Sequence, residues 1–172
     1  MDEPERFFGK YKGTVLQNVD PNGIGRITAS VPAVSSLLPT SWCMPCYPIA
    51  GKKIGVYCAP QIGSGVWIEF EGGDPDKPIW SGCFYGLAAE MPGDSPGANP
   101  VLPNFVIQGQ LQQRIVVSDL PGPTGGIILK SISGASITVN DTGIYIDNGM
   151  GASIKLVAKV VTINDGALMI TG

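Results

Sequence analysis

Apolar and polar residues alternate along much of the chain, in short runs that are separated by turn residues. The alternation is clearest in the last third, where Ile, Val or Leu recurs at every second position. This period of two is typical of β-strands, because successive side chains of a strand point to opposite faces of the sheet. The 24 Gly and 15 Pro residues are scattered without a strict repeat, which favours many turns over long helices. The pattern therefore predicts an all-β protein.

Residues 11–87 are predicted to form a small barrel. The turn Asp20-Pro21-Asn22-Gly23 joins the first two apolar-rich runs as a hairpin. An open sheet of this size would leave long edges unpaired, and closure removes them, so the five-stranded OB barrel is the favoured solution. The predicted strands are Tyr11–Val19, Gly25–Val31, Lys53–Cys58, Gly65–Phe70 and Pro78–Tyr85.

Residues 88–113 are predicted to form a linker, and residues 1–10 a separate N-terminal segment. Prolines in the linker are dense enough to disfavour both helices and sheet ladders. A proline-rich linker is a semi-rigid spacer, so we expect it to hold the following region at a defined distance from the barrel. These prolines are Pro92, Pro96, Pro100 and Pro103.

Residues 114–172 are predicted to form short strands at nearly even spacing, over residues 126–132, 135–140, 143–147, 152–157, 160–164 and 167–171. Because apolar residues occupy every second position, one face of this sheet is predicted to be apolar. The opposite face carries Thr138, Tyr145, Lys155 and Thr162. The apolar positions are Ile137, Val139, Ile144, Ile146, Ile154, Leu156, Val161, Ile163, Leu168 and Ile170.

Such a region has one apolar stripe and no second layer to cover it, and its long edges invite association with another chain. We therefore expect an oligomer, in which identical chains turn their stripes toward a shared axis and cyclic symmetry closes the structure. Periodicity alone does not fix three copies. The alternative is a monomeric meander or β-solenoid that packs back on the barrel.

The charge balance disfavours a nucleic-acid partner. The chain has 11 Lys and Arg against 14 Asp and Glu, a net charge of −3, so it lacks the excess of cations that phosphate backbones attract. An alternative interpretation remains, in which the chain is an OB-fold module that binds single-stranded nucleic acid or another oligomeric ligand by stacking it on aromatic rings. The aromatic candidates, which we otherwise expect in the barrel core or in interfaces, are Trp42, Tyr57, Trp67, Trp80 and Tyr85.

Residues for metal binding or catalysis are sparse. The sequence has no His, and its cysteines Cys43, Cys46, Cys58 and Cys83 include one closely spaced pair, which makes them weak metal candidates. We expect them to be buried or half-buried thiols instead. Glu69 and Glu71 could imitate paired glycosidase carboxylates, but they flank Phe70 as a solvated strand face does. We expect no cofactor and no enzymatic activity.

The first twelve residues mix charged side chains with Phe7 and Phe8 and contain no signal-peptide core. No later stretch has the 18 or so uninterrupted apolar residues of a spanning helix. We therefore expect synthesis in the cytoplasm without a signal peptide.

Five stretches of the sequence carry a family resemblance. Three lie in the predicted barrel: Tyr11-Lys12-Gly13-Thr14-Val15, Pro60-Gln61-Ile62-Gly63-Ser64-Gly65-Val66-Trp67-Ile68-Glu69-Phe70 and Gly73-Asp74-Pro75-Asp76-Lys77-Pro78-Ile79-Trp80-Ser81-Gly82. Two lie in the C-terminal region: Gly134-Ala135-Ser136-Ile137 and Thr142-Gly143-Ile144-Tyr145-Ile146-Asp147-Asn148-Gly149. The first three resemble the OB domain, and the last two the spike, of the VgrG and phage baseplate protein V family, so the resemblance extends from Tyr11 to Leu168.

The resemblance implies a homotrimeric central spike of a contractile injection machine: a phage tail, a tailocin, or a related extracellular or type VI system. Three OB barrels would dock on the hub at the front of the inner tube. The C-terminal regions would form an intertwined triple-stranded β-helix whose core is the apolar stripe from Ile137 to Ile163. Sheath contraction would drive this spike through the target envelope, with only transient membrane contact. The protein, made in a bacterial cytoplasm, would become part of the assembled particle.

One departure from some relatives concerns the tip. Certain spikes of this family end in an iron-binding His-x-His apex, which a sequence without His lacks. The resemblance implies instead an apolar platform that includes Leu168 and Ile170, with a separate PAAR-type tip protein on it.

Overall fold

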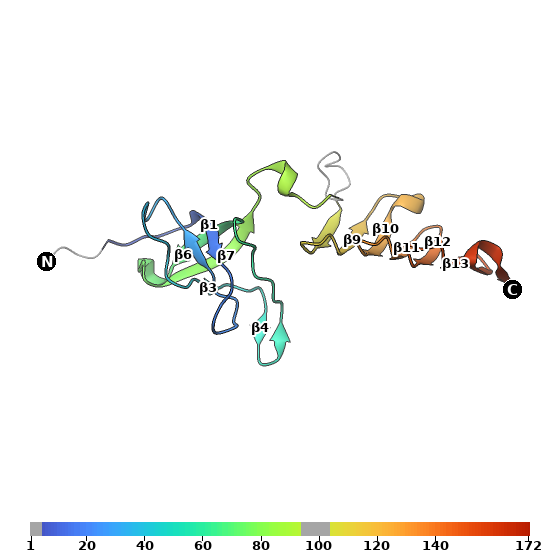
Figure 1. Cartoon of the computed structure of the whole chain (residues 1–172), viewed down its shortest axis with the longest axis horizontal. Helices are drawn as coiled ribbons and strands as arrows, with labels where there is room; N and C mark the ends of the chain where they lie inside the picture. Colours follow the sequence, from blue (N-terminus) through green and yellow to red (C-terminus); the bar gives the residue numbers. More distant parts are fainter. Residues whose placement is uncertain (1–4, 94–103) are drawn as a thin grey trace. The chain divides into compact units, whose positions relative to one another are not determined.

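The computed structural model describes residues 5–93 and 104–172, which form two compact units that divide between Leu87 and Ala88. The described residues contain strands and short 3-10 helices and no α-helix (Figure 1). Accordingly, none of their helices has the length and apolar character needed to span a membrane. The linker prolines Pro96, Pro100 and Pro103 lie outside the described residues.

The first unit is a five-stranded barrel with the strand order β2-β1-β6-β7-β3. Neighbours in this order pair antiparallel, except β3 and β7, which run parallel. Ile27 and Cys43 close the sheet by exchanging two backbone hydrogen bonds of 3.3 and 2.7 Å. The resulting closed topology is that of an OB fold. The elements of this unit are β1 (Tyr11–Gln17), β2 (Thr28–Ser30), β3 (Met44–Pro45), β4 (Ala50–Gly51), β5 (Ile54–Gly55), β6 (Gly65–Phe70), η1 (Glu71–Gly73) and β7 (Pro78–Phe84).

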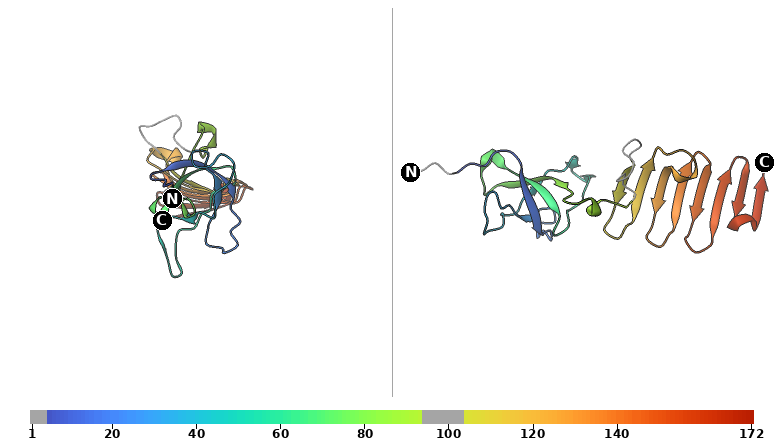
Figure 2. Two further views of the ribbon diagram at one scale, coloured as in Figure 1. Left: turned by 90° about the vertical axis from the view of Figure 1, so that its left-hand side faces the viewer. Right: turned by 90° about the horizontal axis from the view of Figure 1, so that it is seen from above.

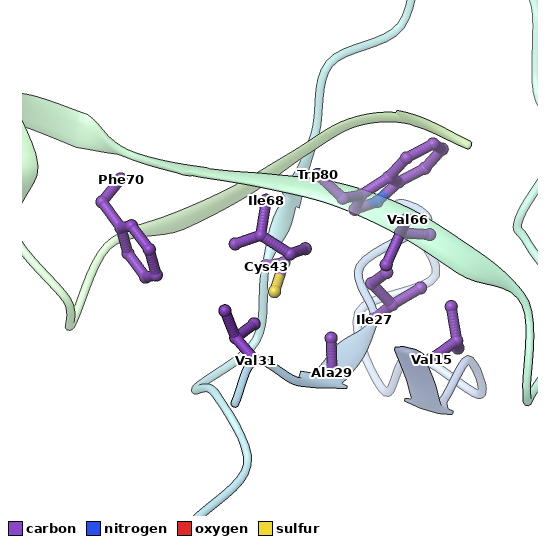
Figure 3. Close-up of a cluster of buried hydrophobic side chains, with 9 residues drawn as sticks. All are labelled: Val15, Ile27, Ala29, Val31, Cys43, Val66, Ile68, Phe70 and Trp80. Atoms are coloured by element: carbon purple, nitrogen blue, oxygen red, sulfur yellow. The ribbon is translucent and has the colours of Figure 1, made fainter. Parts of the chain in front are cut away.

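The barrel is held by an apolar core that every second residue of its strands supplies. Figure 3 shows this cluster, with the sulfur of Cys43 directed into it. Trp80 is 5% exposed and donates its indole N–H to the Gly25 carbonyl at 3.0 Å, so its one polar atom is satisfied. The core residues are Val15, Ile27, Ala29, Val31, Cys43, Val66, Ile68, Phe70 and Trp80.

The strand predicted at Lys53–Cys58 is wrong as a barrel strand. Residues 50–55 form a separate two-stranded hairpin, β4 with β5, whose Ile54 is 69% exposed. The third barrel strand is instead β3, the short segment Met44–Pro45. Sequence patterning misses it because two residues show no period and Pro45 has no N–H to donate.

The N-terminal segment packs on the barrel through Phe7. Its ring lies 5.9 Å from the ring of Phe70 and 6.1 Å from that of Tyr11, and its N–H donates to the Gly73 carbonyl at 2.9 Å. Phe8 is 71% exposed. The segment thus covers the end of the barrel core with one of its two Phe residues.

The second unit is an eight-stranded antiparallel meander in sequence order, from β8 to β15 (Figure 2). Each strand pairs with the next through a continuous register without bulges. The elements are η2 (Ala88–Glu90), β8 (Phe105–Gln108), β9 (Arg114–Ser118), η3 (Gly122–Thr124), β10 (Gly126–Lys130), β11 (Ser136–Asn140), β12 (Gly143–Asp147), β13 (Ser153–Val157), β14 (Val160–Ile163), η4 (Asn164–Gly166) and β15 (Leu168–Thr171).

The predicted linker extends too far along the chain. Residues 105–108, assigned to it from the sequence, form β8 and pair with β9 from Phe105–Val117 to Gln108–Arg114. The reason is local, because the last linker proline is Pro103 and the following run offers backbone N–H groups at every position. The sheet therefore begins earlier than the sequence pattern suggests.

Candidate functional site

The most unusual surface of the described residues is one face of the C-terminal sheet, whose side chains are all apolar and lie in two parallel columns. The register aligns these residues strand by strand, for example Ile137 with Ile146 and Val139 with Ile144. The first column holds Phe105, Val117, Ile127, Val139, Ile144, Leu156, Val161 and Ile170. The second holds Ile107, Ile115, Leu129, Ile137, Ile146, Ile154, Ile163 and Leu168. We call these sixteen residues the apolar face.

In the single chain, the apolar side chains of this sheet are more exposed than polar side chains of its opposite face, a pattern that we call inverted burial. Val161 and Ile163 are half-buried, and the other side chains of the apolar face are between 38% and 62% exposed. On the opposite face Thr138, Tyr145 and Lys155 are half-buried. A contiguous apolar surface of this extent marks an interaction site, because monomeric proteins rarely expose one.

The predicted trimer-core residues, Ile137, Val139, Ile144, Ile146, Ile154, Leu156, Val161 and Ile163, all lie on the apolar face. Their contacts with further copies remain a prediction. Sequence analysis missed Phe105, Ile107, Ile115, Val117, Ile127 and Leu129, which extend both columns over three more strands. The i, i+2 signal is present there, but Val106, Val116 and Ile128 on the other face make those strands continuously apolar and hide the alternation.

The predicted tip residues Leu168 and Ile170 lie in β15, the last strand of the meander. Leu168 pairs with Ile163 and Ile170 with Val161, and they are 52% and 57% exposed. One side of β15 pairs with β14, and no strand of residues 5–93 or 104–172 lies beside the other. The structure thus places both residues at the end of the apolar face, and their role as a platform is a prediction.

The opposite face of the sheet carries polar and charged side chains, some of them paired. Lys155 forms an ion pair and hydrogen bond with Asp165, which raises the pKa of the ammonium above its usual value. Tyr145 shares a 2.7 Å hydrogen bond with the Thr142 hydroxyl, which also donates to the Asn140 side chain. On the same face, the Ser153 hydroxyl and the Gln108 side-chain oxygen are buried without a hydrogen-bond partner among the described residues.

The weak metal candidates are not brought together as a site. Cys43 is buried in the barrel core, where loss of hydration raises the pKa of its thiol to about 11. Cys46, Cys58 and Cys83 are exposed, free thiols, so the prediction of buried or half-buried thiols is wrong for these three. Within residues 5–93 and 104–172, no three His, Cys, Asp or Glu side chains are grouped to hold a metal ion.

The aromatic candidates are dispersed among different roles. Trp80 is core, Trp42 lies under the Arg26 guanidinium at 5.3 Å, and Trp67 packs on Phe84 at 5.0 Å between ring centroids. Tyr57 and Tyr85 are 66% and 59% exposed. The interpretation of these aromatics as core residues holds for Trp80 and not for the exposed tyrosines.

Glu69 does not have the electrostatics of a general acid. Lys10 donates to its carboxylate at 2.8 Å, and this contact lowers the pKa of Glu69 below its usual range. A catalytic acid needs the opposite shift. Glu69 instead joins the N-terminal segment to β6.

Comparisons with known proteins match both units. Residues 11–85 match the sequence model described as the type VI secretion system/phage-baseplate injector OB domain. Residues 104–169 match that of the phage baseplate V C-terminal trimerisation domain. These matches agree with the predicted OB barrel and the predicted trimeric β unit.

A further similarity is to "Type VI secretion system spike protein VgrG4b" of Pseudomonas aeruginosa PAO1, 40% identical over 47 residues. The match covers 27% of this chain and 6% of that relative, so the chain spans only a small part of the longer protein.

Proposed function

The chain belongs to the VgrG and phage baseplate protein V family of spike proteins, and from this premise we propose that three copies form the central spike of a contractile injection machine. The C-terminal sheets supply an intertwined β-helix around a shared axis, with the apolar face of each copy turned inward. The role is structural rather than enzymatic. The proposed trimer is one component of an assembled injection particle.

The observation that carries the proposal is the inverted burial of the C-terminal sheet. Side chains as large as Phe105 and Ile107 are 62% and 56% exposed in one chain, while Thr138, Tyr145 and Lys155 on the opposite face are half-buried. Turning three such faces toward one axis removes this surface from water, at about 25 cal/mol for each Å² of apolar area. The match to a trimerisation domain supports three copies.

The ladder architecture suits a part that transmits force. Eight strands stacked at about 4.8 Å give a sheet on the order of 34 Å long when the strands run nearly across its axis. Every strand is hydrogen-bonded to its neighbour along the whole register, so bending or unravelling breaks many bonds together. An apolar core of three copies adds packing at every level.

The proposed spike has two kinds of partner, one for the barrels and one for the last strand of the C-terminal sheet. We propose that the barrels dock on the hub at the front of the inner tube. At the other end, Leu168 and Ile170 with the free edge of β15 form an apolar platform for a PAAR-type tip protein. Sheath contraction then drives the spike through the target envelope, which the protein contacts only transiently.

Light scattering of the purified full chain tests the proposal. We expect a particle near three times the 18.0 kDa chain mass. The variant Ile137→Asp should lose this mass, whereas Thr138→Asp, one residue along β11 and on the opposite face, should keep it. A wild-type monomer at micromolar concentration would refute the trimeric spike.

A further inference from the structure

The two lateral edges of the C-terminal sheet carry charged side chains in opposite order along the sheet. Because the strands form a meander, each strand begins at one edge and ends at the other, and the turns alternate between the edges (Figure 2). We call the edge with the turn at residues 131–135 the first edge, and the edge with the turn at residues 141–142 the second edge. Each strand lies about 4.8 Å from the next along the sheet, so the strand number gives the height of a residue.

The first edge is basic at its early strands and acidic at its late ones. Arg114 begins β9 and Lys130 ends β10, and the two residues are directly paired across the ladder. Asp147 ends β12 at the same edge, and Asp165 lies in η4, between β14 and β15. Like charges that lie directly opposite each other destabilise a sheet. A carboxylate beside Arg114 and Lys130 is therefore stabilising.

The second edge has the reverse order. Asp119 follows the last residue of β9, and Lys159 lies in the short turn between β13 and β14. Both side chains are exposed. Within residues 5–93 and 104–172, no ion pair includes Asp119, Lys159 or Lys130. Asp141, which lies between Asp119 and Lys159 on this edge, accepts the Gly122 N–H at 3.2 Å, so its carboxylate has a partner in its own chain.

Cyclic symmetry brings these two edges together in the proposed trimer. A rotation about the axis moves no copy along the axis, so the first edge of one copy meets the second edge of the next at the same height. Asp119 then lies at the height of Arg114, in β9, and one strand from Lys130. Lys159 lies about 5 Å along the axis from Asp165 and about 7 Å from Asp147, within reach of its flexible four-carbon stem. Opposite charges thus meet at both ends of the sheet.

We propose that these charges form ion pairs between neighbouring copies at the corners of the trimer and set its axial register, and this rests on the proposed trimer. The apolar face does not set the register alone, because both of its columns are apolar at every strand and match again after a slide of two strands. A slide in one direction takes Lys159 past β15, away from Asp147. A slide in the other direction takes Asp119 past β8, away from Lys130. Only unshifted copies keep both contacts.

Coupling with a carbodiimide tests these contacts in the full chain. The reagent activates a carboxylate, which then forms an amide with a lysine amine that touches it, and the carbodiimide takes up the water that is lost. Covalent dimers and trimers are separated by denaturing electrophoresis, digested and searched for linked peptides by mass spectrometry. We expect two links, Lys130 to Asp119 and Lys159 to Asp147. Within one chain each pair is split between the two edges, about 17 Å apart, so these links join two copies.

The chain supplies its own controls. Lys155 and Asp165 form an ion pair within one chain, so their link is the positive control and should appear in the monomer band as well. Lys130→Arg keeps the charge, but its guanidinium does not couple. This variant should therefore lose the link to Asp119 and keep the trimer mass in light scattering, since exposed ion pairs contribute little to stability.

The outcomes separate this inference from the trimer itself. Both links in a particle of trimer mass support the corner pairs and the unshifted register. A particle of trimer mass that lacks either link, while the Lys155–Asp165 link forms, overturns the inference and leaves the spike proposal standing. A link between Lys130 and Asp165 of two copies overturns it too, because two first edges would then meet. A monomeric mass refutes the trimer, and the corner pairs with it.

Discussion

Replacement of Ile137 by Asp perturbs the apolar face at its centre. Ile137 lies in β11 between Leu129 and Ile146 of the neighbouring strands, and it is 42% exposed in the single chain. In the proposed trimer, three copies of this position face one axis. The substitution therefore places three carboxylates close together in an apolar core, where none of the surrounding residues of the apolar face can donate a hydrogen bond.

The expected effect is large. Removing a charge from water costs several kcal/mol in real proteins, so three buried carboxylates cost on the order of 10 kcal/mol before their mutual repulsion is counted. Each 1.4 kcal/mol is tenfold in the association constant, which makes 10 kcal/mol about seven powers of ten. Because trimer formation depends on the square of the free-chain concentration, the midpoint rises by about three and a half powers of ten. A trimer that forms at micromolar concentration then needs several millimolar protein, on the order of a thousandfold or more above its former midpoint.

Light scattering at about 10 μM protein measures the loss of trimer directly, because this concentration lies between the micromolar midpoint assumed for the wild type and the millimolar midpoint expected for the variant. Thr138→Asp is the matched control for added charge, and Ile137→Asn tests lost apolar contact without a charge. The Asp variant should recover part of its assembly as pH falls, because burial favours the protonated carboxyl and raises its pKa. Stable trimers of Ile137→Asp at neutral pH, equal to those of Thr138→Asp, would refute an inward-facing Ile137.

Three further predictions concern the barrel. All three Trp residues lie in it, so tryptophan fluorescence follows the unfolding of the barrel and not that of the C-terminal sheet. The Arg26 guanidinium lowers the pKa of Asp20 below its usual 3.8, so this carboxylate stabilises the fold above pH 4 and loses that contribution as pH falls; Asp20→Asn should flatten the acid-side fall in Tm, and an unchanged pH dependence would contradict this. Trp80→Phe removes the bond to the Gly25 carbonyl and should destabilise the barrel by about 1–3 kcal/mol in urea, a value that an unaltered midpoint would exclude. Cys43 should resist a thiol reagent in the folded protein and react only after unfolding, because it is buried with its thiol pKa raised to about 11; fast reaction of all four thiols would show that the core is open.

The sequence pattern predicted those parts of the fold that repeat. The strands from Ser136 to Thr171 follow the i, i+2 alternation and the Asn, Asp and Gly turns closely, because each element there is encoded by its own residues. The closed barrel was predicted, but not that Ile27 and Cys43 close it, since one bridge between distant residues has no local signal. Likewise β8 was missed, because its pairing with β9 outweighs the proline-rich context before it.

For the candidate site, patterning identified the apolar face and underestimated its length. It missed the part of the apolar face on β8, β9 and β10, because Val106, Val116 and Ile128 on the other face make those strands continuously apolar and hide the alternation.

The two units solve the problem of burial in different ways. The barrel hides its own apolar residues, whereas Val116 is the one buried apolar side chain among the described residues of the C-terminal sheet. Backbone hydrogen bonds set the register of the sheet, but their net contribution is small against the entropy of ordering its strands. The missing apolar burial must then come from other copies. It follows that this sheet gains most of its stability, and with it the stiffness that a spike requires, only when three chains assemble.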